Sequence, residues 1–437
     1  MTAIWLSWPR RALRAAGDRA LALSAGAATA HYYEEAFELA ADSDSDRPFA
    51  LLHYGKALHL TRDERRFDVL DEPHDALVAA GETEAAAAVQ SSSAPTETRA
   101  VVLSVVARFR ALFGDVDLDD IHEALQAARA VGRDDLQARN LITLGGMRFV
   151  AGELTAGIGD IERGIELAKK AGSVFDVSRG YTNLATFVDA SGDLVRSNEY
   201  AEEGLRYAEL FGVVDAIRFN RGNLIMYRLY SGEWADAERA ANEFLAESEA
   251  SPHYMDFTAL IVRAFIALSR DRLDDADDDV EEALVRARAI EDPQALQPAL
   301  SFAAFFHAEV GEVRDAQAAL DELSLPDFAE AEVYFAAATL GDTSLREHLP
   351  GPERETPWDR AARAVLDLRW GDAADLYERI GDRPTEALAR LRAAQAFLDA
   401  GSRADANEEL RKALAFWRSV GATRYIREGE ALMAASA

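Results

Sequence analysis

A short turn signal recurs along the chain at nearly constant spacing, and this repeat constrains the fold more than any other feature. Fixed periods of this length are typical of repeat architectures, in which each repeat is one supersecondary unit. From Gly311 onward the period shortens to 30 residues, with further glycines at positions 341, 371 and 401. The earlier copies, 38 to 40 residues apart, are Gly114-Asp115, Gly152-Glu153, Gly192-Asp193, Gly232-Glu233, Asp271-Arg272 and Gly311-Glu312.

The residues on both sides of these turns predict two helices that cross closely. An apolar residue stands eight before the turn, as at Leu144, and a small residue stands five after it, as at Gly157. Apolar positions continue at helical spacings of three and four. Glycine adopts the left-handed conformation that ends the first helix, and the acidic residue beside it favours the start of the second. A further glycine or proline, such as Gly132, Gly172 or Pro293, is expected to end the second helix.

One such hairpin leaves an apolar face that only a neighbouring hairpin can cover, so the repeats are expected to stack. We therefore predict an all-α fold, a right-handed α-solenoid of antiparallel helix hairpins. The pattern resembles the tetratricopeptide repeat: a leucine and a small residue in the first helix, then small, apolar and small positions in the second. The usual tetratricopeptide repeat is about 34 residues long, so both periods of this chain depart from it. The resemblance implies a superhelix whose first helices line a concave groove.

Both ends of the chain carry a narrower resemblance. The segment 404–428, ADANEELRKALAFWRSVGATRYIRE, is similar to the C-terminal arm of large bacterial signalling proteins. In that family an adenylate/guanylate cyclase-type domain, or a LuxR-like DNA-binding domain, is joined to a nucleotide-hydrolysing ATPase module and then to such repeats. The segment 16–36 resembles the start of the same arm. The resemblance implies a regulatory arm, because the catalytic parts of that family have no counterpart in this chain.

Breaks in composition divide the chain into regions. Residues 1–90 are predicted to form N-terminal helical repeats, with 1–9 outside the repeat, and 91–96 form a polar linker. Central repeats of about 40 residues are predicted over 97–348, and shorter repeats with a capping helix over 358–437. Prolines at 350, 352 and 357 forbid continued helix, so the segment between Leu349 and Pro357 is predicted to be a loop.

Composition also narrows the classes of partner and location. A formal net charge of −30 repels phosphate backbones and anionic lipid, so neither nucleic-acid binding nor membrane binding is expected. No apolar run reaches the roughly 18 residues that a membrane helix needs. The apolar N-terminus is followed by two arginines, whereas in a secretory signal the basic residues precede the apolar segment. Cytoplasm is the expected location. The absence of cysteine excludes disulfides and cysteine nucleophiles.

No motif for catalysis, cofactor binding or metal binding is complete in this sequence. Gly157-Ile158-Gly159 begins a dinucleotide pattern, but Glu162 takes the place of the third glycine. His122-Glu123 starts a zinc-protease helix motif, but Gln126 stands where the second histidine belongs. The acidic run Asp274–Glu282 is interpreted as a solvated helix start. We therefore predict a protein that is not an enzyme and has no cofactor or metal.

Candidate ligand-binding residues are those that recur along the expected groove. Thirteen residues before the turn stand Arg139, Arg179 and Phe219, and nine residues before it stand Asn183 and Asn223. Arginine and asparagine supply directed hydrogen bonds that suit a peptide backbone or a carboxylate. The alternative is that these side chains bond the helices of neighbouring repeats to each other.

Three functions follow as hypotheses. The favoured one is a non-catalytic scaffold or regulatory arm that binds a protein or peptide in signalling. The second is a sensor arm that holds a small-molecule ligand in the same groove. The third is a detached C-terminal part of a cyclase-type or ATPase regulator. Trp5 and Trp8, outside the repeat, are compatible with self-association.

Overall fold

The computed structural model describes residues 118–249, 253–290, 292–324, 330–351 and 355–436. Before residue 118 it describes only 12–13, 16–17, 26–38, 54, 100–101, 103–104 and 107–108. Most of the predicted N-terminal region, the whole linker 91–96, the turn at Gly114 and the two N-terminal tryptophans therefore lie outside the described residues.

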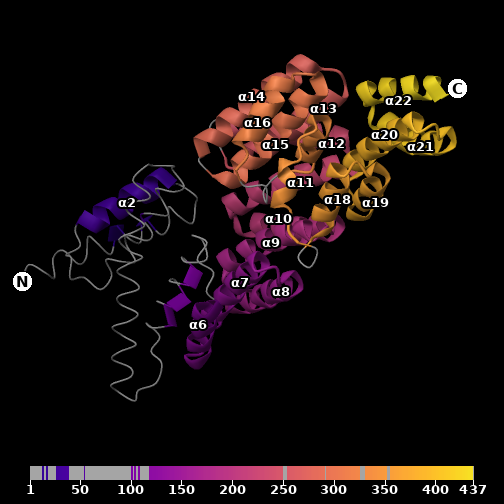
Figure 1. Ribbon diagram of the computed structural model, residues 1–437. Coiled ribbons are helices and arrows are strands. Elements are labelled where there is room, and N and C mark those ends of the chain that lie inside the picture. The colour runs from indigo at the N-terminus through magenta and orange to yellow at the C-terminus, as the bar shows by residue number, and fades with distance from the viewer. Residues whose placement is uncertain are drawn as a thin grey trace, which may run out of the picture. The chain divides into compact units, whose positions relative to one another are not determined.

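Within the described residues every regular element is a helix, and consecutive helices run as hairpins (Figure 1). The elements are α2 (Gly26–Glu38), α6 (Leu118–Ala130), α7 (Asp134–Val150), α8 (Leu154–Ala171), α9 (Val174–Ala190), α10 (Leu194–Phe211), α11 (Val214–Ser231), α12 (Trp234–Ser248), α13 (Asp256–Ser269), α14 (Leu273–Ile290), α15 (Pro293–Val310), α16 (Val313–Glu322), α17 (Glu332–Leu340), the 3-10 helix η2 (Ser344–His348), α18 (Pro357–Leu366), α19 (Trp370–Ile380), α20 (Arg383–Asp399), α21 (Arg403–Val420) and α22 (Thr423–Ser436).

The predicted turns coincide with helix ends in left-handed backbone. Glycine adopts this left-handed conformation at little cost in free energy. The conformation lets the last carbonyl groups of the helix accept hydrogen bonds from backbone amides. At Gly152, for example, the following amide of Glu153 donates to the carbonyl of Arg148 at 2.8 Å. The predicted turn residues with positive φ are Gly152 (84°), Gly192 (83°), Gly232 (85°), Asp271 (59°), Gly311 (87°), Gly341 (71°) and Gly401 (77°).

Two positions in the predicted pattern were wrong. Gly371 is the second residue of α19, and Leu368, with φ of 56°, makes the turn instead. α19 begins at Trp370, whose ring lies 5.6 Å from that of Phe335. Pro293 does not end a helix but begins α15, where its missing N–H has no helical partner to lose.

The predicted loop before the last helices is confirmed over the residues described there. The described residues between η2 and α18, namely 349–351 and 355–356, are not helical, and Pro357 is the first residue of α18. Thr356 and Asp359 form a capping box, in which each side chain accepts a hydrogen bond from the other residue's backbone amide.

The predicted close crossing of paired helices is clearest between α7 and α8. A Cβ atom added at Gly157 would lie 2.6 Å from the carbonyl oxygen of Gly145, and one added at Gly145 would lie 2.4 Å from a side-chain carbon of Ile161. Real Cβ atoms essentially never come so close to their neighbours, so glycine is required at both positions. Two small residues thus bring the two helix backbones into contact.

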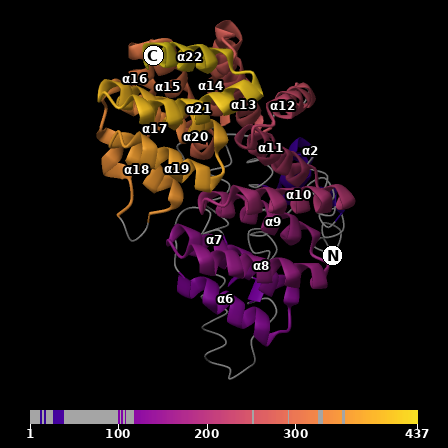
Figure 2. The ribbon, with the colours of Figure 1, turned by 90° about the vertical axis from the view of Figure 1, so that its right-hand side faces the viewer.

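Contacts along the chain define two compact units. Unit 1 comprises residues 1–184 and 203–217, and unit 2 comprises 185–202 and 218–437. In unit 2 a core of aromatic rings surrounds Trp234, whose ring lies 5.8 Å from that of Phe265 and 6.1 Å from that of Trp417. The last helices, α20, α21 and α22, lie side by side (Figure 2), and α22 also packs against α13.

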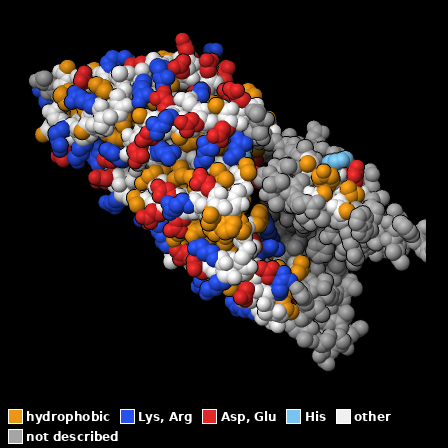
Figure 3. Space-filling view, turned by 180° about the vertical axis from the view of Figure 1, so that it is seen from behind, with side chains coloured by type: hydrophobic (Ala, Val, Ile, Leu, Met, Phe, Trp, Pro, Cys, Tyr) orange, Lys and Arg blue, Asp and Glu red, His pale blue; other side chains and the backbone are white. Residues whose placement is uncertain are grey.

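The described surface mixes the two signs of charge. Figure 3 shows Lys and Arg side chains interspersed with Asp and Glu side chains over the face in view. Such mixing means that the net charge of −30 is not a uniform field, and that local clusters of one sign are informative. None of the helices that the structure describes combines the length and the apolarity needed to cross a membrane.

Candidate functional site

Arg139 and Arg179, two of the predicted groove residues, meet at one buried carboxylate in unit 1. Asp176 lies in the first turn of α9, and its side chain is fully buried. Arg139, from α7, donates through Nε and Nη2 to the two oxygens of Asp176 at 3.4 and 3.3 Å. Arg179 lies one turn after Asp176 and donates to Asp176 Oδ1 at 3.4 Å and to the carbonyl oxygen of Arg139 at 3.0 Å. The 40-residue period therefore places equivalent arginines in adjacent first helices.

Arg108 adds a third guanidinium group that the sequence pattern did not indicate. Its guanidinium carbon lies 5.5 Å from the centre of the Phe175 ring. Its Nε is buried and has no hydrogen-bond partner, and the same holds for Nε of Arg179. Burial first, and then the positive charge of Arg139, lower the pKa of Arg108, while Asp176 opposes them. Arg108, Arg139 and Arg179 are called the arginine cluster below.

The arginine cluster carries more positive charge than Asp176 neutralises. Burial and the charge of Arg108 lower the pKa of Arg179 to about 9, although Asp176 acts in the opposite direction. Burial alone would raise the pKa of Asp176, but Arg139, Arg179 and the hydroxyl of Ser173, which donates to it at 2.7 Å, outweigh burial, and the pKa falls. Buried charges are normally paired, so two surplus positive charges beside one carboxylate form a site that favours an anion.

The cluster is also open to solvent. The side chain of Arg139 is 29% exposed and that of Arg179 is 16% exposed. Both guanidinium groups are flat and present several N–H donors in fixed directions, which matches the two oxygens of a carboxylate or the oxygens of a phosphate. The arrangement can therefore bind an anion without any covalent chemistry.

The other three predicted residues have separate surroundings. Asn183 lies on α9 one turn after Arg179, is half-buried, and makes no hydrogen bond to the described residues. Phe219 and Asn223 lie on α11 and belong to unit 2. There the ring of Phe219 stacks on that of Tyr254, with centres 6.4 Å apart and planes 9° apart. The face of the Phe219 ring that stacks on Tyr254 is therefore not available to a ligand.

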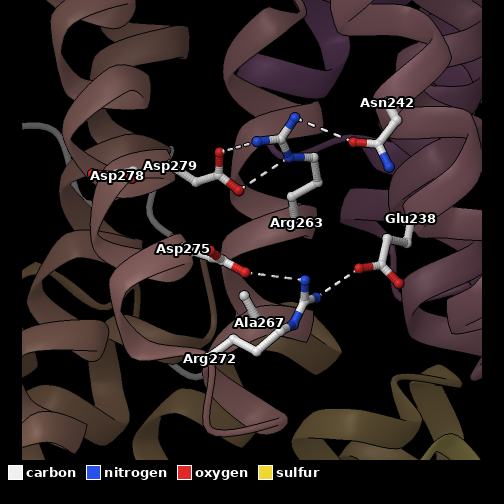
Figure 4. A pocket seen from close by; sticks show the side chains of 8 residues that line it. All are labelled: Glu238, Asn242, Arg263, Ala267, Arg272, Asp275, Asp278 and Asp279. Carbon is white, nitrogen blue, oxygen red and sulfur yellow. Dashed lines mark hydrogen bonds and ion pairs between the residues drawn. The ribbon is translucent and has the colours of Figure 1, made fainter.

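A polar hollow of about 240 Å³ in unit 2 is a second place for a ligand. Figure 4 shows Arg263 and Arg272 in the middle of it, each reaching side chains on both α12 and α14. Arg263 bonds Asp279 and Asn242, and Arg272 bonds Glu238 and Asp275. The hollow is lined by Glu238, Asn242, Arg263, Ala267, Arg272, Asp275, Asp278 and Asp279.

Both arginines that line this hollow are already bonded to side chains of the protein. Nε of Arg263 donates to Asp279 at 3.0 Å, and Nη1 of the same side chain donates to Asn242 at 3.2 Å. Arg263 stands eight residues before the turn at Asp271, where other repeats have an apolar residue. We interpret the paired arginines as cross-links between α12, α13 and α14, and we favour the arginine cluster as the functional site.

Among the described residues, one group of three side chains has donor atoms close enough to hold a metal ion. His307, Glu312 and Asp315 bring one possible ligand atom each within 4.8 Å of one another at the turn between α15 and α16. The ring Nδ1 of His307 lies 2.8 Å from Glu312 Oε2, so part of this group is already bonded internally. Exposed acidic groups are common without an ion, and the prediction of no metal site remains a prediction.

Comparisons with known proteins show likeness in fold but not in sequence. No family model and no curated protein matches the chain. A crystal structure of a Rap protein complexed with competence and sporulation factor is 11% identical, with a TM-score of 0.52 over 88% of this chain and 99% of that one. The apo form of RapI is 11% identical, with a TM-score of 0.46 over 95% and 98% of the two chains. Yeast Tom70 is 14% identical, with a TM-score of 0.40 over 96% and 88%.

The first of these likenesses bears on the predicted fold. At 11% identity it concerns the fold alone, and that fold is a tetratricopeptide-like helical repeat. The all-α prediction, made from the spacing of the turns, is therefore confirmed.

Proposed function

We propose that this protein is a non-catalytic helical-repeat scaffold that binds an acidic segment of a protein or peptide partner at the arginine cluster. The observation that carries the proposal is the surplus of buried positive charge on Arg108, Arg139 and Arg179. A carboxylate of the partner would accept hydrogen bonds from these donors and complete the charge balance that Asp176 leaves open. The fold supports this role, since a Rap protein of similar fold has been crystallised with a bound factor.

The negative net charge of the chain does not argue against an acidic ligand. At physiological ionic strength the Debye length is about 8 Å, so exposed charges farther away are largely screened. Donors in direct contact with the ligand, inside the protein, are screened much less. The local surplus of arginine decides whether an anion binds, and the distant acidic surface mainly lowers the rate of encounter.

Binding of a labelled peptide tests the proposal. We expect fluorescein-labelled hexaglutamate to bind the full chain at 150 mM salt and hexaglutamine to bind far more weakly. Arg108→Met and Arg179→Gln should each weaken hexaglutamate binding by at least about 10-fold, because each removes a charged donor from a partly buried site. The matched control is Arg163→Gln, which removes one exposed positive charge in the same unit and leaves its partner Asp160 paired with Arg148. Equal binding of both peptides, or equal effects of all three substitutions, contradicts the proposal.

A small-molecule sensor is the second candidate, because the same cluster would accept a free dicarboxylate. Thermal unfolding in succinate distinguishes the two, since a ligand that binds only the folded state raises the melting temperature. A rise with succinate, lost in Arg179→Gln and unaccompanied by hexaglutamate binding, favours the sensor. The signalling context and the link to cyclase-type or ATPase proteins rest on the resemblance at residues 16–36 and 404–428, and the cytoplasmic location rests on the apolar pattern of the sequence. All three remain predictions.

A further inference from the structure

Four carboxyl groups from separate segments of unit 2 are near enough for the charge of one to act on the others. Asp189 lies near the end of α9, Glu330 just before α17, Glu332 at the start of α17, and Asp382 just before α20. Asp382 is 1% exposed and Glu332 is 7% exposed, whereas Asp189 and Glu330 are half-buried. The charge of Asp382 acts on each of the other three. These four residues are called the acid cluster.

Three aromatic side chains lie against the acid cluster. The rings of Tyr230 and Trp358 are 6.3 Å apart, and those of Trp358 and Tyr377 are also 6.3 Å apart. The hydroxyl of Tyr230 donates to Glu330 Oε2 at 3.4 Å, and the indole N–H of Trp358 donates to the carbonyl oxygen of Asp189 at 2.8 Å. Trp358 is half-buried, so it borders the cluster together with the two half-buried acids.

No cation among the described residues forms an ion pair with any of the four carboxyl groups. Arg383, next to Asp382, donates instead to the carbonyl oxygen of Ser231 at 2.9 Å and lies over the ring of Phe416. Arg390, further along α20, bonds other carboxylates, namely Glu378, Glu386 and Glu409. The acid cluster is thus a concentration of largely buried carboxyl groups without the counter-charge that their ionised forms would normally have.

Asp382 shows the missing partner most directly. Its Oδ1 accepts a hydrogen bond from the amide of Thr385 at 3.1 Å and so caps α20. Its Oδ2 is buried and has no hydrogen-bond partner. An unsatisfied buried carboxylate oxygen is costly, and a hydrogen-bond donor that reached it from a bound group would remove that cost.

We propose that the acid cluster and its three aromatic rings form a binding site for an arginine side chain of a partner protein. Carboxylates accept the hydrogen bonds of a guanidinium group, and aromatic faces attract its delocalised charge. A metal ion fits less well. The one described group of three residues whose donor atoms lie within 4.8 Å of one another is at His307, so the carboxylate oxygens of the cluster are too spread out to chelate an ion. A guanidinium group with its separated donors spans such a spread.

Burial explains how the free chain tolerates this cluster. Burial raises the pKa of Asp189, Glu330 and Asp382 to about 7 and that of Glu332 to about 8. Near neutral pH the free cluster therefore keeps protons that a bound arginine would displace. This site is independent of the arginine cluster, since all its residues belong to unit 2 and its charge preference is opposite.

Calorimetry with a blocked tripeptide tests the inference on the full chain. The probe is N-acetyl-Gly-Arg-Gly-amide at pH 8, and its uncharged match has citrulline in place of arginine. We expect the arginine peptide to bind with release of protons, seen as a heat that differs between buffers of different ionisation enthalpy. The citrulline peptide should bind at least about 10-fold more weakly, since it lacks the charge.

Two variants make the test specific. Asp382→Asn keeps an oxygen that can cap α20 and removes the unpartnered charge, so the fold is expected to persist and arginine-peptide affinity to fall by about 10-fold or more. Glu347→Gln removes an exposed charge of unit 2 elsewhere and should change affinity less than 2-fold. The inference is overturned if citrulline binds equally, if Asp382→Asn has no effect, if 10 mM MgCl₂ displaces the peptide, or if free arginine binds more tightly than the blocked peptide.

Discussion

The guanidinium group of Arg108 lies over the ring of Phe175, and its buried Nε has no hydrogen-bond partner among the described residues. Sequence analysis did not single it out, because it does not stand thirteen or nine residues before its turn as the other candidates do. Arg139 and Arg179 were found because they share one repeat position, and the structure brings them to the same carboxylate of Asp176. Position within a repeat thus predicted two of the three arginines.

Removing the charge of Arg108 should stabilise the free protein. Arg108→Met keeps a long apolar side chain against Phe175 and removes a desolvated charge beside Arg139. We expect the free energy of unfolding to rise by on the order of 1 kcal/mol, as for other buried charges replaced by apolar groups. Urea unfolding followed by circular dichroism measures this change. The comparison is Arg163→Met, which removes an exposed guanidinium group while Asp160 keeps its ion pair with Arg148, with an expected change within about 1 kcal/mol.

A loss of more than about 1 kcal/mol in Arg108→Met would show that the guanidinium is satisfied in the free protein, and the surplus of charge in unit 1 would then be smaller than inferred.

At the scale of elements, two glycines of α8 have different roles although they are two residues apart. Gly157 faces Gly145 of α7 across the crossing, whereas a Cβ atom at Gly159 would meet nothing within 4 Å. Gly157→Ala should therefore lower the free energy of unfolding by about 2 kcal/mol, because α7 and α8 must move apart to make room for the added methyl group. Gly159→Ala should raise the free energy of unfolding by about 0.5 to 1 kcal/mol, because alanine loses less backbone entropy than glycine when it enters a helix.

Urea midpoints of the two alanine variants, measured side by side, test this contrast. Similar effects of the two substitutions would mean that α7 and α8 are not held at the close distance seen in the structure.

The helix ends show where local sequence suffices and where it does not. Glycine at six predicted turns ends a helix because it takes positive φ at low cost. At Leu368 a leucine, which disfavours positive φ, takes the same conformation, and α19 begins two residues later at Trp370, which packs on Phe335. The preference of glycine for such turns therefore did not place this turn, which the pattern put at Gly371.

At the scale of the whole molecule, the acid cluster makes stability depend on pH. Its four carboxyl groups have folded-state pKa values of about 7 to 8, above their values in an unfolded chain. Between about pH 4 and pH 8 the folded state therefore binds more protons than the unfolded state, and the free energy of unfolding falls as pH rises. We expect a fall of at least about 2 kcal/mol from pH 5.5 to pH 8.

The double variant Asp382→Asn, Glu332→Gln separates this effect from the general repulsion of a chain with net charge −30. It should unfold at higher urea concentration than the parent at pH 8 and nearly the same concentration at pH 5.5. Parallel curves for parent and variant across that range would mean that the two acids ionise as freely as exposed ones.

The sequence alone determined the helical repeat, because glycine turns and apolar spacing act over a few residues and need no knowledge of distant partners. It also determined that Arg139 and Arg179 stand in register, since they are one period apart. Only the tertiary structure decided which charges lack partners. Arg108 and Asp176 are 68 positions apart and Asp189 and Asp382 are 193 apart, and whether such groups are neutralised depends on burial and on what packs beside them.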